Sequence, residues 1–143
     1  MSIFGAVGRW YYLLMYITAL AVCLLPTYFK NKDNYHYRSL GASGAVSSVI
    51  FAFIFLNPLQ GIGLIFLPRE LMIPGFIFGL LYLVISSYLD KKGGGNINHS
   101  AHIWGALYGI IFLIITAYFF SGTDLLVSFI QSVKSYFGRF STF

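Results

Sequence analysis

Four long apolar runs, each almost free of charge, constrain the fold of this chain more than any other feature. They cover about residues 10–29, 40–56, 71–89 and 101–120. A helix needs roughly 20 apolar residues to cross the ~30 Å hydrocarbon core of a bilayer. A soluble domain also needs a polar surface, yet charged residues make up only 9% of the 143 residues, against roughly 25% in soluble domains. The sequence therefore predicts an all-α, multi-pass integral membrane protein with four transmembrane helices, forming one domain over residues 1–143.

The segments between the runs are polar or rich in turn formers. The first two runs are separated by KNKDNYHYRS, the next two by NPLQGIGLIFLPRE, and the last two by DKKGGGNIN. Residues 124–143 follow the fourth run, and their apolar residues recur at helical spacing: Leu125, Phe129, Val133, Phe137 and Phe140. This spacing predicts an amphipathic helix at the membrane interface. The alternative is a weakly ordered tail.

The net charge of +5 raises the question of a nucleic-acid partner. The nine Lys and Arg residues, however, all lie in or beside the gaps between the apolar runs. Basic residues that border bilayer spans are interfacial anchors, and they form no basic face here. The sequence thus indicates the lipid bilayer as a partner and no nucleic acid. The three histidines lack carboxylate or cysteine companions at ligand spacing, so we expect no metal and no cofactor.

Two polar residues stand near the starts of the second and fourth runs, where a membrane tolerates few of them. Because successive spans alternate in direction, these two runs are parallel, which places Ser43 and His102 on one side of the bilayer at similar depth. A neutral imidazole beside a serine hydroxyl takes the serine proton as the oxygen attacks a carbonyl. The pair therefore predicts nucleophilic catalysis, while helix packing and interfacial anchoring are the alternatives. His99 either lies on the same helical side as His102 or is a solvated loop residue.

Small residues recur every few positions in the same two runs. In the fourth run they are Ala101, Gly105 and Gly109, and in the second run they are Gly41, Ala45, Ser48 and Ala52. Such stripes let helices approach closely. At ~100° per residue, Ser43 projects nearly opposite the stripe of its own helix. Either the first turn around Gly41 and Gly44 is irregular, or the stripe packs on a different neighbour.

Two motifs in these runs resemble those of the rhomboid family of intramembrane serine proteases. They are Gly41-Ala42-Ser43-Gly44 and Ala101-His102-Ile103-Trp104-Gly105, and the resemblance extends over roughly residues 3–120. It implies that Ser43 is the nucleophile and His102 the general base of a dyad without an acidic third member. Gly41, Gly44 and Gly105 would support packing and the oxyanion site. The implied reaction is hydrolysis of peptide bonds in or near the transmembrane segments of protein substrates, at the extracytoplasmic side of the bilayer.

The sequence departs from the family pattern at two points. The family core has six spans and the chain matches the last four, so the helix whose His and Asn bind the oxyanion has no counterpart here. Some members also carry a Tyr one turn after the nucleophile, stacked on the catalytic His, where this sequence has Ser47. Two alternatives to an active protease follow: a non-catalytic rhomboid-like protein, or truncated fragment, that binds transmembrane segments, and a small transporter or structural module.

Overall fold

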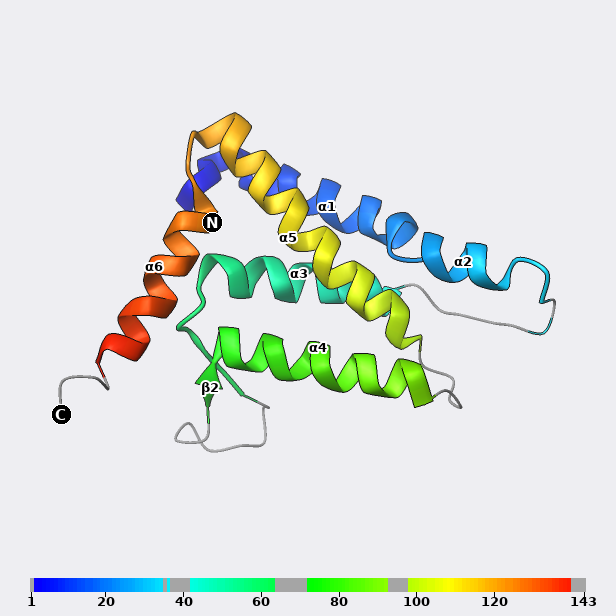
Figure 1. Cartoon of the computed structure of the whole chain (residues 1–143). Coiled ribbons are helices and arrows are strands. Elements are labelled where there is room, and N and C mark those ends of the chain that lie inside the picture. The colour runs from blue at the N-terminus through cyan, green and yellow to red at the C-terminus, as the bar shows by residue number, and fades with distance from the viewer. Residues whose placement is uncertain (1, 35, 37–41, 64–71, 93–97, 140–143) are drawn as a thin grey trace.

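The structure is a computed structural model that describes residues 2–34, 36, 42–63, 72–92 and 98–139. Figure 1 shows a bundle of helices: η1 (Ser2–Val7), α1 (Gly8–Val22), α2 (Leu25–Asn31), α3 (Ala42–Leu56), α4 (Gly75–Lys92), α5 (His99–Ser121) and α6 (Leu125–Gly138). The predicted all-α class is confirmed. One short antiparallel pairing was not predicted, and it joins β1 (Gly61–Ile62) to β2 (Ile73–Pro74).

Two of the expected spans differ in detail from the helices that form. The first comprises α1 and α2, which are separated at Cys23 and Leu24. Pro26 lies in the first turn of α2, where a backbone N–H would have no partner within the helix, so the N–H that proline lacks costs no hydrogen bond. The third begins at Gly75 rather than near residue 71, because Ile73 and Pro74 pair with β1 before the helix starts. Residue 71 and the first two residues of the second expected span lie outside the described residues.

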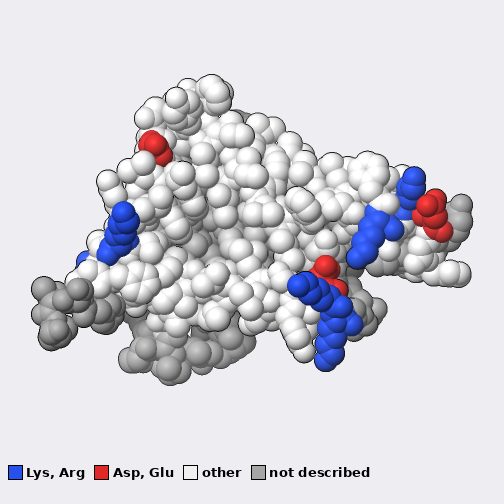
Figure 2. All heavy atoms as spheres, viewed as in Figure 1, with Lys and Arg blue, Asp and Glu red and all other residues white. Residues whose placement is uncertain are grey.

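Among the described residues, two helical stretches are long and apolar enough to cross a membrane. They are Phe4–Asn31, with a mean hydropathy of 1.8, and His99–Ser121, with 2.1, and α3 is a shorter apolar helix. Only 22% and 33% of their most apolar windows are buried within the chain, whereas the core helix of a soluble domain is mostly covered. Large apolar side chains such as Trp10, Ile17 and Phe119 point outward. Figure 2 shows charged side chains at the margins of the visible face, whose middle is uncharged and is therefore free to contact lipid.

Helix α5 packs along α3, and the two run in the same direction (Figure 1). A Cβ atom added at Gly105 would overlap the Gly44 carbonyl oxygen, and one at Gly109 would overlap the Ser48 carbonyl oxygen. From the first of these contacts to the second, both helices advance by four residues in the same direction along the chain, as parallel helices require. The stripe on α5 is thus the surface through which the two backbones touch, and α3 meets it through Gly44 and Ser48.

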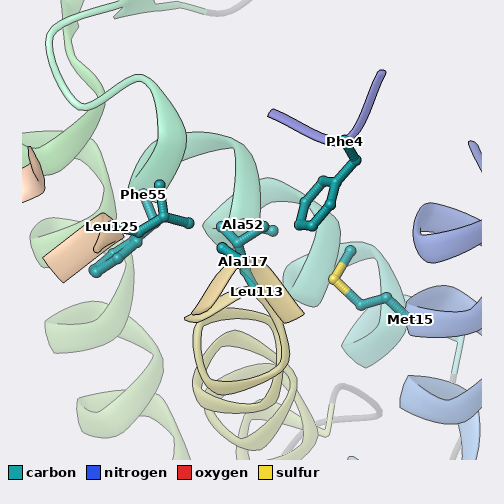
Figure 3. Packing of buried hydrophobic residues seen from close by; sticks show 7 residues of the cluster. All are labelled: Phe4, Met15, Ala52, Phe55, Leu113, Ala117 and Leu125. Atoms are coloured by element: carbon teal, nitrogen blue, oxygen red, sulfur yellow. The ribbon is translucent and has the colours of Figure 1, made fainter. Parts of the chain in front are cut away.

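The hydrophobic core lies toward the C-terminal ends of α3 and α5. Figure 3 shows its seven buried residues, Phe4, Met15, Ala52, Phe55, Leu113, Ala117 and Leu125. Helix α6 joins this core, because Leu125 is buried and the Phe129 ring stacks on Phe55 with centroids 4.6 Å apart. The tail forms this helix in the structure, and the first residues of its apolar stripe pack on the bundle. Phe140 lies outside the described residues. The core leaves the N-terminal ends of α3 and α5, with Ser43 and His102, at the other end of the bundle.

Candidate active site

Ser43 is the second residue of α3, and its side chain is exposed. The next residue, Gly44, is closely packed, because an added Cβ would lie 2.6 Å from the Cys23 Sγ and 2.8 Å from the Ala101 carbonyl oxygen. Because Gly44 faces α5, Ser43 projects to a different side of α3, as the helical geometry predicts. Its hydroxyl makes no hydrogen bond within the described residues. It is therefore open to a ligand.

His102 lies in the first turn of α5 and is half-buried. Gly44 contacts Ala101 and Gly105, which flank His102 along the chain, so Ser43 and His102 stand at the same depth. The Nε2 atom of His102 is buried and has no hydrogen-bond partner in the part of the chain that the structure describes. A buried polar atom without a partner costs about 1–3 kcal/mol and so needs a specific explanation, of which a catalytic role is one. The Nδ1 atom of His99 is in the same state among the described residues. No hydrogen bond joins His102 to Ser43 among these residues.

Tyr82 of α4 contacts both of the helices that carry these two residues. Its hydroxyl lies 2.8 Å from the Ser47 Oγ, and Ser47 in turn donates a hydrogen bond of 3.1 Å to the Ser43 carbonyl oxygen. The centre of the Tyr82 ring lies 6.0 Å from that of His102. The sequence does not predict this placement of Tyr82, because an aromatic residue in an apolar run is equally typical of a surface that faces lipid.

A cavity of about 400 Å³ opens between α4 and the start of α5. Its lining comprises Phe78, Leu81, Tyr82, Ile85, Ser86 and Leu89 of α4, with His99 and His102 of α5. His99 is half-buried on the cavity wall with its ring 5.7 Å from that of His102, which favours the first of its two interpretations. A mostly apolar cavity of this size with a few polar groups suits an apolar side chain or a small ligand.

Asn98 fixes the turn that carries both histidines. Its side-chain oxygen accepts a hydrogen bond from the Ala101 N–H at 3.0 Å and so caps α5. Its Nδ2 donates to the Thr27 Oγ1 of α2 at 3.1 Å, and both residues are buried. The cap therefore ties the start of α5 to α2. An Asn just before an apolar helix is a recognisable start signal in sequence, but the Thr27 contact spans 71 residues and has none.

Comparison with known families decides the family of the chain. A family model described as Rhomboid domain matches residues 2–119, which is most of the sequence. The chain belongs to the rhomboid family. No curated protein and no solved structure matches it. The resemblance carried by the two motifs is thus confirmed, and as a rhomboid domain the chain is an integral membrane protein with a helical bundle fold.

Two of the three glycines in the rhomboid motifs lie at the contact between α3 and α5. Gly44 and Gly105 contact each other through the backbone, and this contact holds the helix with Ser43 against the helix with His102. Gly41 lies outside the described residues. In the described part of this rhomboid chain, no group of three or more His, Cys, Asp or Glu side chains is placed to hold a metal ion.

Proposed function

We propose that this rhomboid protein is a multi-pass intramembrane serine endopeptidase, in which α3 and α4 cross the bilayer beside the two longer stretches. Ser43 is the nucleophile and His102 the general base. The observation that carries the proposal is the buried Nε2 of His102, which lacks a partner in the described chain while Ser43 stands at the same depth on the adjoining helix. A base that is held without a hydrogen bond is ready to accept a proton.

The proposed reaction has two steps. The Ser43 Oγ attacks the carbonyl carbon of the scissile peptide bond while the His102 Nε2 takes the hydroxyl proton, which it then gives to the leaving nitrogen. Water, deprotonated by the same imidazole, next hydrolyses the acyl ester and frees Ser43. The Ser43 backbone N–H lies in the first turn of α3, where helical N–H groups have no intrahelical partner, so it can donate to the oxyanion.

The substrate class follows from the surroundings of the dyad. Ser43 is exposed at the end of a helix, and the cavity beside His102 is lined mainly by apolar side chains. A helical transmembrane segment has its backbone hydrogen bonds satisfied internally, so its peptide bonds are shielded from attack. We therefore expect substrates whose transmembrane segment contains helix-breaking residues near one end, with an apolar side chain next to the scissile bond that enters the cavity.

Reconstituted protein and a reporter with a Gly- and Pro-containing transmembrane segment test this proposal. We expect wild-type protein to cut the reporter within or beside that segment, and Ser43→Ala to leave it intact. A matched reporter with an uninterrupted leucine segment controls for access and should be cut far more slowly. Cleavage of equal rate and position by Ser43→Ala would show that Ser43 is not the nucleophile.

Proteolysis should also depend on pH through the base. A protonated imidazole cannot accept the serine proton, so kcat/KM should fall as the pH drops from 8 to 5, approaching a tenfold loss per pH unit below the pKa of the free-enzyme imidazole. The measurement is reporter cleavage across this range, with protein returned from pH 5 to pH 8 as the control for irreversible damage. A profile that stays flat at still lower pH, in protein that regains its activity at pH 8, would contradict the general-base role.

The second candidate function is a rhomboid-like protein that binds transmembrane segments without cutting them. It is favoured by one observation, which is that no hydrogen bond joins Ser43 to His102 in the described chain. It predicts that a photo-crosslinking transmembrane peptide attaches near the α4–α5 cavity while the reporter stays intact. Crosslinking together with cleavage favours the protease.

A further inference from the structure

Ring packing is the contact that the described residues make with the His102 imidazole. Within the described residues, neither nitrogen of this imidazole has a hydrogen-bond partner. Two aromatic rings lie beside it. The Tyr82 ring lies 6.0 Å away at an angle of 34°, and the His99 ring lies 5.7 Å away, edge-on at 85°. The direction in which His102 points therefore depends on where these two rings are fixed.

Tyr82 is itself fixed from several sides. Its hydroxyl bonds to Ser47, whose side chain is only 1% exposed, and its ring packs against Phe51 and Phe78 with centroids 5.5 and 6.2 Å away. A serine hydroxyl has one hydrogen to donate, and Ser47 gives it to the Ser43 carbonyl oxygen. The Tyr82 hydroxyl is then the donor to Ser47. The bonds form a directed chain from Tyr82 through Ser47 to the backbone of Ser43.

We propose that Tyr82 is a positioning residue, which orients the His102 imidazole relative to Ser43 and is anchored for this purpose by Ser47. One side chain on α4 then contacts Ser47 on α3 and His102 on α5. The effect on catalysis rests on the proposed function, whereas the effect on the orientation of His102 does not. The experiment therefore has one readout for each.

The first readout is the imidazole signal of His102 in protein labelled with ¹⁵N-histidine and assigned with His102→Gln. Tyr82→Phe and Ser47→Ala each remove the anchoring bond and keep the aromatic ring, and Tyr82→Ala removes both. We expect the His102 signal to move in all three variants, and most in Tyr82→Ala. Tyr88→Ala is the matched control, because Tyr88 lies on the same helix with 64% of its side chain exposed, and it should leave the signal unchanged.

An unmoved His102 signal in folded Tyr82→Ala overturns the proposal. If Tyr82→Ala does not fold, Tyr82→Phe and Ser47→Ala decide, and an unmoved signal in both overturns it equally. This result does not depend on whether the protein hydrolyses anything.

The second readout is reporter cleavage. Small displacements of a reacting group cost up to roughly 10²-fold in rate, so we expect kcat to fall about tenfold in Tyr82→Ala and severalfold in Tyr82→Phe, with KM nearly unchanged. The Tyr82→Phe/Ser47→Ala double variant should match the single variants, because all of them lack the same bond. Equal kcat in wild type and folded Tyr82→Ala overturns the positioning role. Absence of cleavage by wild type, with a His102 signal that still moves, overturns the proposed function alone.

Discussion

Replacement of Gly105 by valine is expected to separate α5 from α3 and to abolish proteolysis. Even the Cβ of alanine at this position would overlap the carbonyl oxygen of Gly44, and a backbone atom has no rotamer through which to move away. Overpacking a close-packed interior costs typically about 1–3 kcal/mol, and an overlap with the backbone lies at the upper end or above. We expect the midpoint of thermal unfolding in detergent to fall for Gly105→Ala and further for Gly105→Val.

Gly138 provides the control for this pair of variants. It also lies in a helix, and an added Cβ there would meet nothing within 4 Å. Gly138→Ala should leave the unfolding midpoint unchanged or raise it slightly, since alanine favours a helix by up to about 1 kcal/mol over glycine. A Gly105→Val protein with wild-type stability and wild-type cleavage would contradict the close contact between α3 and α5.

Replacement of His102 by alanine is expected to lower kcat by roughly 10³-fold or more, the scale on which a general base contributes. His99→Ala is the matched control, because His99 lies one turn earlier on α5 and lines the same cavity. We expect it to change kcat by less than about tenfold, since a neighbouring ring supports the base without accepting the proton. Reporter cleavage by both variants, at equal amounts of folded protein, measures the difference.

Equal losses of kcat in the two variants would contradict the assignment of His102 as the base. They would show instead that the histidine pair acts together, for example by shaping the cavity. A loss confined to KM in His102→Ala would likewise indicate a binding role rather than a chemical one.

The sequence predicts the helical bundle well because long uncharged runs leave a chain little choice in a bilayer. Spacing alone also identifies the α5 side of the close helix contact, since Ala101, Gly105 and Gly109 recur once per turn of one face. It does not identify the α3 side, where Gly44 and Ser48 make the contact and Gly44 is not part of the expected stripe. It does not predict the late start of α4, because that depends on the pairing of Ile73 with Ile62 across a connecting segment. Such a pairing leaves no periodic signal.

The part of the candidate site that the sequence does not reveal is the role of Tyr82. Its contact with Ser47 spans 35 residues and depends on how α4 is rotated about its axis. A helix that is apolar on all faces carries no moment that would fix this rotation from the sequence. From the sequence, Ser47 is notable only because some members of the rhomboid family carry a Tyr at this position. In the structure, Tyr82 contacts Ser47 from a different helix, α4.

The central claim is that Ser43 and His102 form an activated pair, and labelling with a fluorophosphonate probe tests it most directly. The probe reacts only with a serine whose oxygen has been made nucleophilic, so it needs no knowledge of the natural substrate. We predict that folded wild-type protein is labelled, that mass spectrometry of its peptides places the label on Ser43, and that Ser43→Ala and His102→Ala abolish it. A folded wild-type protein that takes up no label, or one whose labelling survives Ser43→Ala, would contradict the account.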